Sequence, residues 1–190
     1  MHGQLLTDWT IRLALIGYAV VLAGEIVAPL ATRRSIWARL AWTGGCALFL
    51  AHVACAFQFF HHWSHAEAYD NTALRTGEMI GFRFGPGIFF SYLFGLLWAG
   101  DVGWWWLAPR SYAARPWWLS TLLHAYLFFI AFNGAIVFEG GPTRWAASAA
   151  VLGLLVLLLA RILGRRSSSA DAPAVGRTGS DAESSATVDA

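Results

Sequence analysis

Five long apolar segments constrain the fold of this chain more than any other feature of its sequence. Each has about 20 residues or more, enough for a helix rising about 1.5 Å per residue to cross roughly 30 Å of hydrocarbon. Lipid offers the backbone no hydrogen-bonding partners, so a spanning segment is helical or part of a closed barrel, which five strands cannot form. The segments are residues 9–31, 36–60, 86–107, 117–138 and 145–164. The sequence therefore predicts an all-α integral membrane protein, a bundle of about five transmembrane helices.

The composition agrees with this fold class. Of the 190 residues, 57% are hydrophobic and 13% are charged, whereas soluble domains have roughly 45–50% and about 25%. A soluble core of this size cannot bury so much apolar surface, so we expect the lipid bilayer to be the main partner, with other membrane subunits as further candidates. The net charge of +2 gives no indication of a nucleic-acid partner.

The arginines indicate how the chain is oriented. Short loops on the cytoplasmic side of a membrane carry an excess of Lys and Arg. On one side lie Arg33, Arg34, Arg39, Arg110, Arg115, Arg161, Arg165 and Arg166, and on the other only Arg12, Arg75, Arg83 and Arg144. The bias predicts a multi-pass protein of the cell membrane with its N-terminus outside and its C-terminus in the cytoplasm.

This orientation divides the chain into two parts. Residues 1–164 form the predicted transmembrane domain, and residues 61–85 are its long outer segment. Residues 165–190 are small, polar and low in complexity, so they cannot bury enough apolar area to offset the entropy of ordering. We expect them to form a disordered cytoplasmic tail.

Three polar residues lie within the predicted spans: Glu25, Asp101 and His124. Counted from the outer ends of their spans, they lie at one level, roughly 21–24 Å deep. No arginine falls in the middle of a span, which leaves His124 as the only cation at that depth. At least one carboxyl is then expected to be protonated or to share its proton. The three form either a layer that relays protons or coordinates ions, or separate hydrogen bonds that only hold helices together.

The segment FQFFHHWSH (57–65) places three histidines at the outer end of the second span. No Gly or Pro interrupts residues 46–76, so the helix would continue through this segment. On a straight helix His61, His62 and His65 fall within about 100° of one another. Imidazoles at i and i+4 can hold a metal, and zinc or copper suits this ligand type. Further outer-side ligands would be Glu67, Asp70, Glu78 and His2. The alternative is a polar collar at the membrane interface.

A b-type haem is a further cofactor that the histidines permit. It needs two axial ligands at similar depth, and His52 and His124 differ by roughly 8 Å along their helices. A shallower polar layer of weaker signal comprises His52, Ser91, Tyr92 and Asn133.

No nucleophile-elbow, zinc-protease or phosphate-loop motif occurs, which favours a non-enzymatic role and leaves enzymatic activity an open alternative. The leading hypothesis is an outer-side histidine site for a transition metal or haem, in metal handling or electron transfer. The alternatives are a proton-coupled transporter or channel component that uses Glu25, Asp101 and His124, and a non-catalytic subunit of a larger membrane complex.

Overall fold

The computed structural model describes residues 2–137 and 141–170, and this part of the chain consists of helices joined by short turns and loops, without strands. Its elements are α1 (His2–Val27), α2 (Pro29–Arg34), α3 (Ile36–Phe60), α4 (His65–Ile80), α5 (Gly87–Leu107), α6 (Pro109–Ala113), α7 (Trp117–Phe132), the π-helix η1 (Asn133–Val137) and α8 (Gly141–Ala170). The predicted all-α class is confirmed for the described residues.

Four of the described helices are long and apolar enough to cross a membrane. Their apolar parts are Gly3–Val27, Ile36–Phe60, Trp117–Val137 and Thr143–Gly164. The helix α5 is not among them, because its 21 residues include Asp101 and four tryptophans, which lower its hydropathy. These four helices support a membrane protein, and a fifth span along α5 stays a prediction.

Three helix ends differ from the sequence prediction. The first helix starts seven residues earlier than expected and ends at Val27, because Pro29 starts the separate short helix α2. At the other end, α8 continues to Ala170, so the first residues of the predicted tail 165–190 are helical. The remainder of that tail, residues 171–190, lies outside the described residues.

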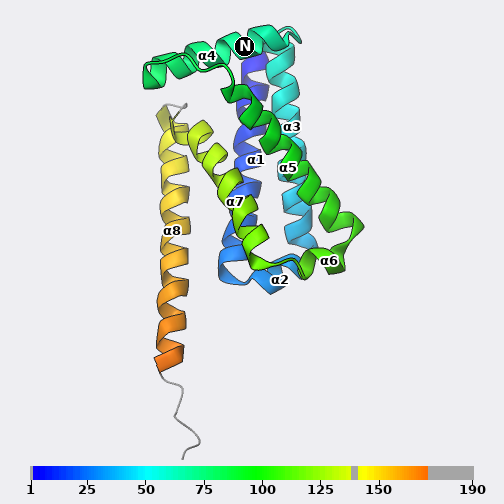
Figure 1. The fold of residues 1–190 in the computed structure, drawn as a ribbon, viewed down its shortest axis with the longest axis vertical. Helices are drawn as coiled ribbons and strands as arrows, with labels where there is room; N and C mark the ends of the chain where they lie inside the picture. The colour runs from blue at the N-terminus through cyan, green and yellow to red at the C-terminus, as the bar shows by residue number, and fades with distance from the viewer. Residues whose placement is uncertain (1, 138–140, 171–190) are drawn as a thin grey trace, which may run out of the picture.

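The long helices run up and down between two ends of a bundle (Figure 1). Helix α1 packs most extensively on α3, α5 packs on α3 and α7, and α8 lies along α1. The helix α4 lies across one end, whereas α2 and α6 lie at the opposite end. The helices α1, α3, α5, α7 and α8 therefore pass from one end to the other in alternating directions.

Glycines allow α1 and α3 to approach each other closely. A Cβ atom on Gly45 would lie 3.3 Å from the backbone oxygen of Ala14 and 3.0 Å from the ring of Trp98. A Cβ atom on Gly17 would lie 3.1 Å from the backbone oxygen of Ala41. Small residues of this kind let membrane helices pack backbone against backbone. This contact holds α1 and α3 together, and α5 and α8 pack against this pair.

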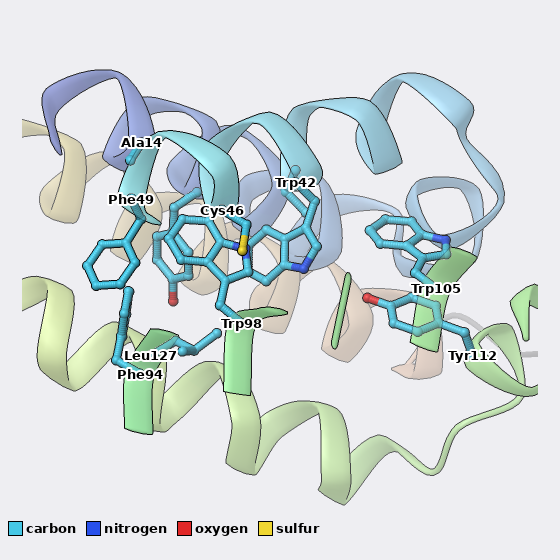
Figure 2. Packing of buried hydrophobic residues seen from close by; sticks show 11 residues of the cluster. Ala14, Trp42, Cys46, Phe49, Phe94, Trp98, Trp105, Tyr112 and Leu127 are labelled. Atoms are coloured by element: carbon cyan, nitrogen blue, oxygen red, sulfur yellow. The ribbon is translucent and has the colours of Figure 1, made fainter. Parts of the chain in front are cut away.

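Aromatic rings fill the space between α1, α3 and α5. Trp42 and Trp98 lie with ring centroids 5.0 Å apart, and Tyr18 contacts both. Figure 2 shows this cluster with Phe49 at one end and the stacked pair Trp105 and Tyr112 at the other. Such tilted and edge-on ring pairs add roughly 0.5–1.5 kcal/mol each beyond their buried area. The core is therefore rigid and apolar, and it separates the two ends of the bundle.

Candidate functional site

A buried ion pair joins α5 to the segment between α6 and α7. Arg115 Nη1 donates to Asp101 Oδ1 at 2.6 Å, and the two side chains are 1% and 3% exposed. Asp101 Oδ2 accepts two further hydrogen bonds, from Trp42 Nε1 at 2.9 Å and from the Tyr112 hydroxyl at 3.0 Å. Pro109 starts the short helix α6, which turns the chain so that Tyr112 and Arg115 reach back to α5.

Neighbouring rings shield this ion pair from solvent. Tyr112 stacks on Trp105 with a centroid separation of 4.5 Å, and the guanidinium of Arg115 lies 4.1 Å above the Tyr112 ring. Burial, followed by the nearby Asp101 carboxylate, raises the pKa of the Tyr112 hydroxyl, which therefore stays protonated as a donor. The arrangement is a structural clamp around the Asp101 carboxylate, in which Arg115 bonds through Nη1 while its Nε and Nη2 are buried without a described hydrogen-bond partner.

A second ion pair forms where α1 meets α2. Arg33 Nη2 lies 3.1 Å from Glu25 Oε2, and Arg33 Nε donates to both carboxylate oxygens at 3.2 Å. Arg33 Nη2 also donates to Ser120 Oγ on α7 at 3.0 Å. From α8, Arg161 Nη1 donates to the backbone oxygens of Glu25 and Ile26, the last carbonyls of α1. A cation at a helix C-terminus is stabilised by the helix dipole.

These contacts correct the predicted charge layer. Arg115 and Arg33 extend into the bundle from the connecting segments, so the expectation that His124 is the only cation at this depth is wrong. Each carboxylate has its own arginine, and neither is bonded to His124 among the described contacts. The three residues lie near the same end of the bundle, but they form two ion pairs and a separate imidazole. Whether any of them moves a proton stays a prediction.

His124 stands apart from the charged pairs. The residue is only 8% exposed, and its ring lies edge-on to that of Trp42, with the ring centroids 5.5 Å apart. No described group lies within hydrogen-bonding distance of either ring nitrogen. An unsatisfied buried polar group costs about 1–3 kcal/mol, so an imidazole in this position needs an explanation.

Beside His124 lies a crevice of about 740 Å³ between α1, α2, α7 and α8. One wall is polar and includes Glu25, Arg33, Ser120, His124 and Arg161. The other walls are apolar and include Leu22, Phe128, Leu154 and Leu158. The helices α7 and α8 lie close together near η1 and diverge towards α2 (Figure 1), and the crevice lies between them. Its volume is typical of a ligand pocket, roughly 300–1,000 Å³.

The histidines of residues 61–65 do not share one helix. The helix α3 ends at Phe60, and His62 and Trp63 have φ angles of 46° and 58°, in the left-handed region that side chains rarely adopt. Ser64 then starts α4 by accepting a hydrogen bond from the Glu67 amide at 3.2 Å. The assumption of a continuous helix is therefore wrong, and the common face of His61, His62 and His65 is lost with it.

The described contacts of His61 and His65 are with different aromatic side chains. His61 lies edge-on to Phe57 at 5.7 Å, and burial lowers the pKa of its imidazole. His65 Nδ1 lies 2.9 Å from the Tyr92 hydroxyl oxygen. Among the described residues no group of three or more His, Cys, Asp or Glu side chains could hold a metal. Zinc or copper binding stays a prediction without a ligand set in this part of the chain.

The proposed haem ligands lie in different places. His52 lines a cavity of about 200 Å³ together with Ser91 and the π-helical Gly134, whereas His124 lines the crevice. His52 Nδ1 is 2.9 Å from the backbone oxygen of Thr7. Rings in successive contact lead from His52 through Phe49, Trp98 and Trp42 to His124. The two imidazoles therefore do not face each other across one cavity, and haem binding stays a prediction.

The shallow polar layer is only partly brought together. His52 and Ser91 share the smaller cavity, while Tyr92 contacts His65 and Asn133 donates to the backbone oxygen of Phe129 at 2.7 Å.

Replacing His124 with phenylalanine is expected to stabilise the protein. The phenyl ring keeps the contact with Trp42 and removes two unpaired buried nitrogens, which cost about 1–3 kcal/mol. Thermal unfolding in detergent, without added lipid, should show a higher Tm than the wild type. A lower Tm would mean that His124 has a partner that stabilises the fold.

Comparison with known protein families, curated proteins and solved structures finds no match for this chain. Its function must therefore be argued from the site itself.

Proposed function

We propose that this chain is a multi-pass membrane protein that binds one amphiphilic, lipid-like molecule in the crevice between α1, α7 and α8. The observation that carries the proposal is the pairing of apolar walls with a polar wall that holds the unpartnered imidazole of His124.

We further propose five spans, with α5 counted as the third, the N-terminus outside and the C-terminus in the cytoplasm of the cell. Two observations support this arrangement. The chain passes between the two ends of the bundle along α5 as it does along the other long helices (Figure 1). The arginine-rich helices α2 and α6 lie together at the end opposite α4, as cytoplasmic connections would. Asp101 is tolerable in such a span because its charge is fully paired.

The chemistry of the crevice favours an amphiphile over other ligands. In the proposed orientation the crevice between α7 and α8 lies at the level of the inner leaflet. If only water filled the crevice, it would lie unfavourably against the apolar side chains of α8. If only a hydrocarbon chain filled it, the polar wall would have no hydrogen-bonding partner. A molecule with an apolar tail and a polar head satisfies both walls. Metal handling, proton-coupled transport and the role of a non-catalytic subunit stay predictions that no contact at this site favours.

The proposal is tested by cross-linking lipids to the protein, with and without a substitution that fills the crevice. The full chain is reconstituted in vesicles of dioleoyl phosphatidylcholine and phosphatidylglycerol that contain trace photoreactive analogues of both, and cross-linked peptides are identified by mass spectrometry. Cross-links should concentrate on residues 117–128 and 151–162. Leu154→Trp places a large ring in the crevice and should reduce them about tenfold, equivalent to about 1.4 kcal/mol.

Leu152→Trp is the matched control. Leu152 lies on the same helix, is 63% exposed and does not line the crevice, so this variant should label like the wild type. Equal labelling of every lipid-facing helix, unchanged by Leu154→Trp, would refute the proposal.

A further inference from the structure

We infer that the ligand of this crevice is an acidic phospholipid, whose phosphate is bound beside Arg161 and whose acyl chain lies against α8. This inference rests on the proposed function and adds the chemical class of the head group.

The charges that line the crevice favour an anion. Its charged lining residues are Glu25, Arg33 and Arg161, which leaves one positive charge in excess. Arg33 neutralises Glu25, since its Nε donates to both carboxylate oxygens and its Nη2 lies 3.1 Å from Oε2, so the carboxylate repels an incoming phosphate only weakly. Arg161 uses Nη1 for the carbonyls of α1, and its other guanidinium nitrogens make no hydrogen bond with a described group. They are therefore the donors that a phosphate would meet.

The start of α7 adds a second positive feature. Trp117 lines the crevice and is the first residue of this 16-residue helix, whose N-cap Pro116 provides no side-chain hydrogen bond. The partial positive charge and the free amide groups of a helix N-terminus favour a phosphate nearby.

His124 is the independent observation that points to a bound molecule. It lies one turn from Ser120 along α7, deeper in the bundle than Trp117, and is more than nine-tenths buried with both ring nitrogens unpaired. A phospholipid has ester oxygens between its phosphate and its acyl chains. An imidazole N–H at this depth is suited to donate to such an oxygen, while the phosphate stays at the level of Arg161. A fatty tail without an ester group would leave His124 unmatched.

The test compares two lipids that differ only in the head group. Photoreactive phosphatidylglycerol and phosphatidylcholine with identical acyl chains are used separately in vesicles of the full chain, and cross-links to residues 151–162 are counted. The acidic lipid should label the crevice about fivefold more, the effect of about one arginine on an anionic lipid. Arg161→Gln should abolish this preference, and Arg161→Lys should retain part of it. Arg144→Gln, at the other end of α8 and outside the crevice, should keep it.

Each outcome has a distinct meaning. Equal labelling by the two lipids would overturn the acidic head group and leave amphiphile binding intact, whereas no concentration of either label in the crevice would overturn the proposed function itself. A preference that survives Arg161→Gln would overturn the assignment of Arg161. Excess inorganic phosphate should not displace the lipid, and displacement would identify a site for soluble phosphate instead. The wild-type comparison does not depend on the folding of any variant.

Discussion

Replacing Arg115 with leucine is expected to lower the free energy of unfolding by about 3–5 kcal/mol. The Asp101 carboxylate would then remain buried without its cation, retaining only the hydrogen bonds from Trp42 and Tyr112. The desolvation of an unpaired charge is the dominant cost, since the side chains of the pair are almost fully buried. Thermal and denaturant unfolding of the full chain in detergent would measure the loss.

Two variants show whether the effect comes from the ion pair. Arg110→Leu removes an exposed arginine from the same connection and should leave stability within about 0.5 kcal/mol of the wild type. Asp101→Asn combined with Arg115→Leu removes both charges but keeps an oxygen for Trp42 and Tyr112, so it should recover more than half of the loss. If Arg115→Leu is no more harmful than Arg110→Leu, the buried ion pair does not exist as described.

Replacing Gly45 with leucine is expected to separate α1 from α3 and to destabilise the bundle by about 3 kcal/mol or more, at the upper end of overpacking effects. Even a single Cβ at Gly45 would lie 3.0 Å from the Trp98 ring and 3.3 Å from the Ala14 backbone oxygen. The backbone of α1 cannot move away without losing its contact with α3. Reduced yield of folded protein and a lower Tm should follow.

The neighbouring glycine provides the control. A Cβ on Gly44 would meet no described atom within 4 Å, and leucine has the higher helix propensity by roughly 0.8 kcal/mol. Gly44→Leu should therefore be neutral or stabilising. Similar Tm values for the two leucine variants would show that the close approach of α1 and α3 is not required.

Much of the helical framework could be predicted from local sequence. The bounds of α3 coincide with the predicted segment 36–60, and α5 starts within one residue of its prediction at 86. Apolar length and the positions of Pro and Gly are local signals, and they determine where a helix can be buried in lipid. Apolar length does not predict the end of α8, because the last turns of this helix are polar.

The prediction of a continuous helix through the histidine segment was wrong for a different reason. Neither Gly nor Pro marks the break after Phe60, and the left-handed conformations of His62 and Trp63 are unusual for such residues. The one local sign was Ser64 followed by Glu67, a capping pattern that predicts a new helix start. With the break in place, His61 packs on Phe57 and His65 approaches Tyr92 instead of each other.

The sequence by itself determined that the chain is helical, apolar enough for a membrane, and richer in arginine on one side, because these properties depend on composition and on residues close together in the chain. Only the tertiary structure decided how the polar residues are paired. Arg115 reaches Asp101 across 14 positions and Arg33 reaches Ser120 across 87, through turns whose direction depends on how the helices pack. The same packing left His124 without a partner at the crevice. Charge pairing in the bundle therefore follows from the close contact of α1 and α3 and from the turns of α2 and α6, which no periodicity in the sequence encodes.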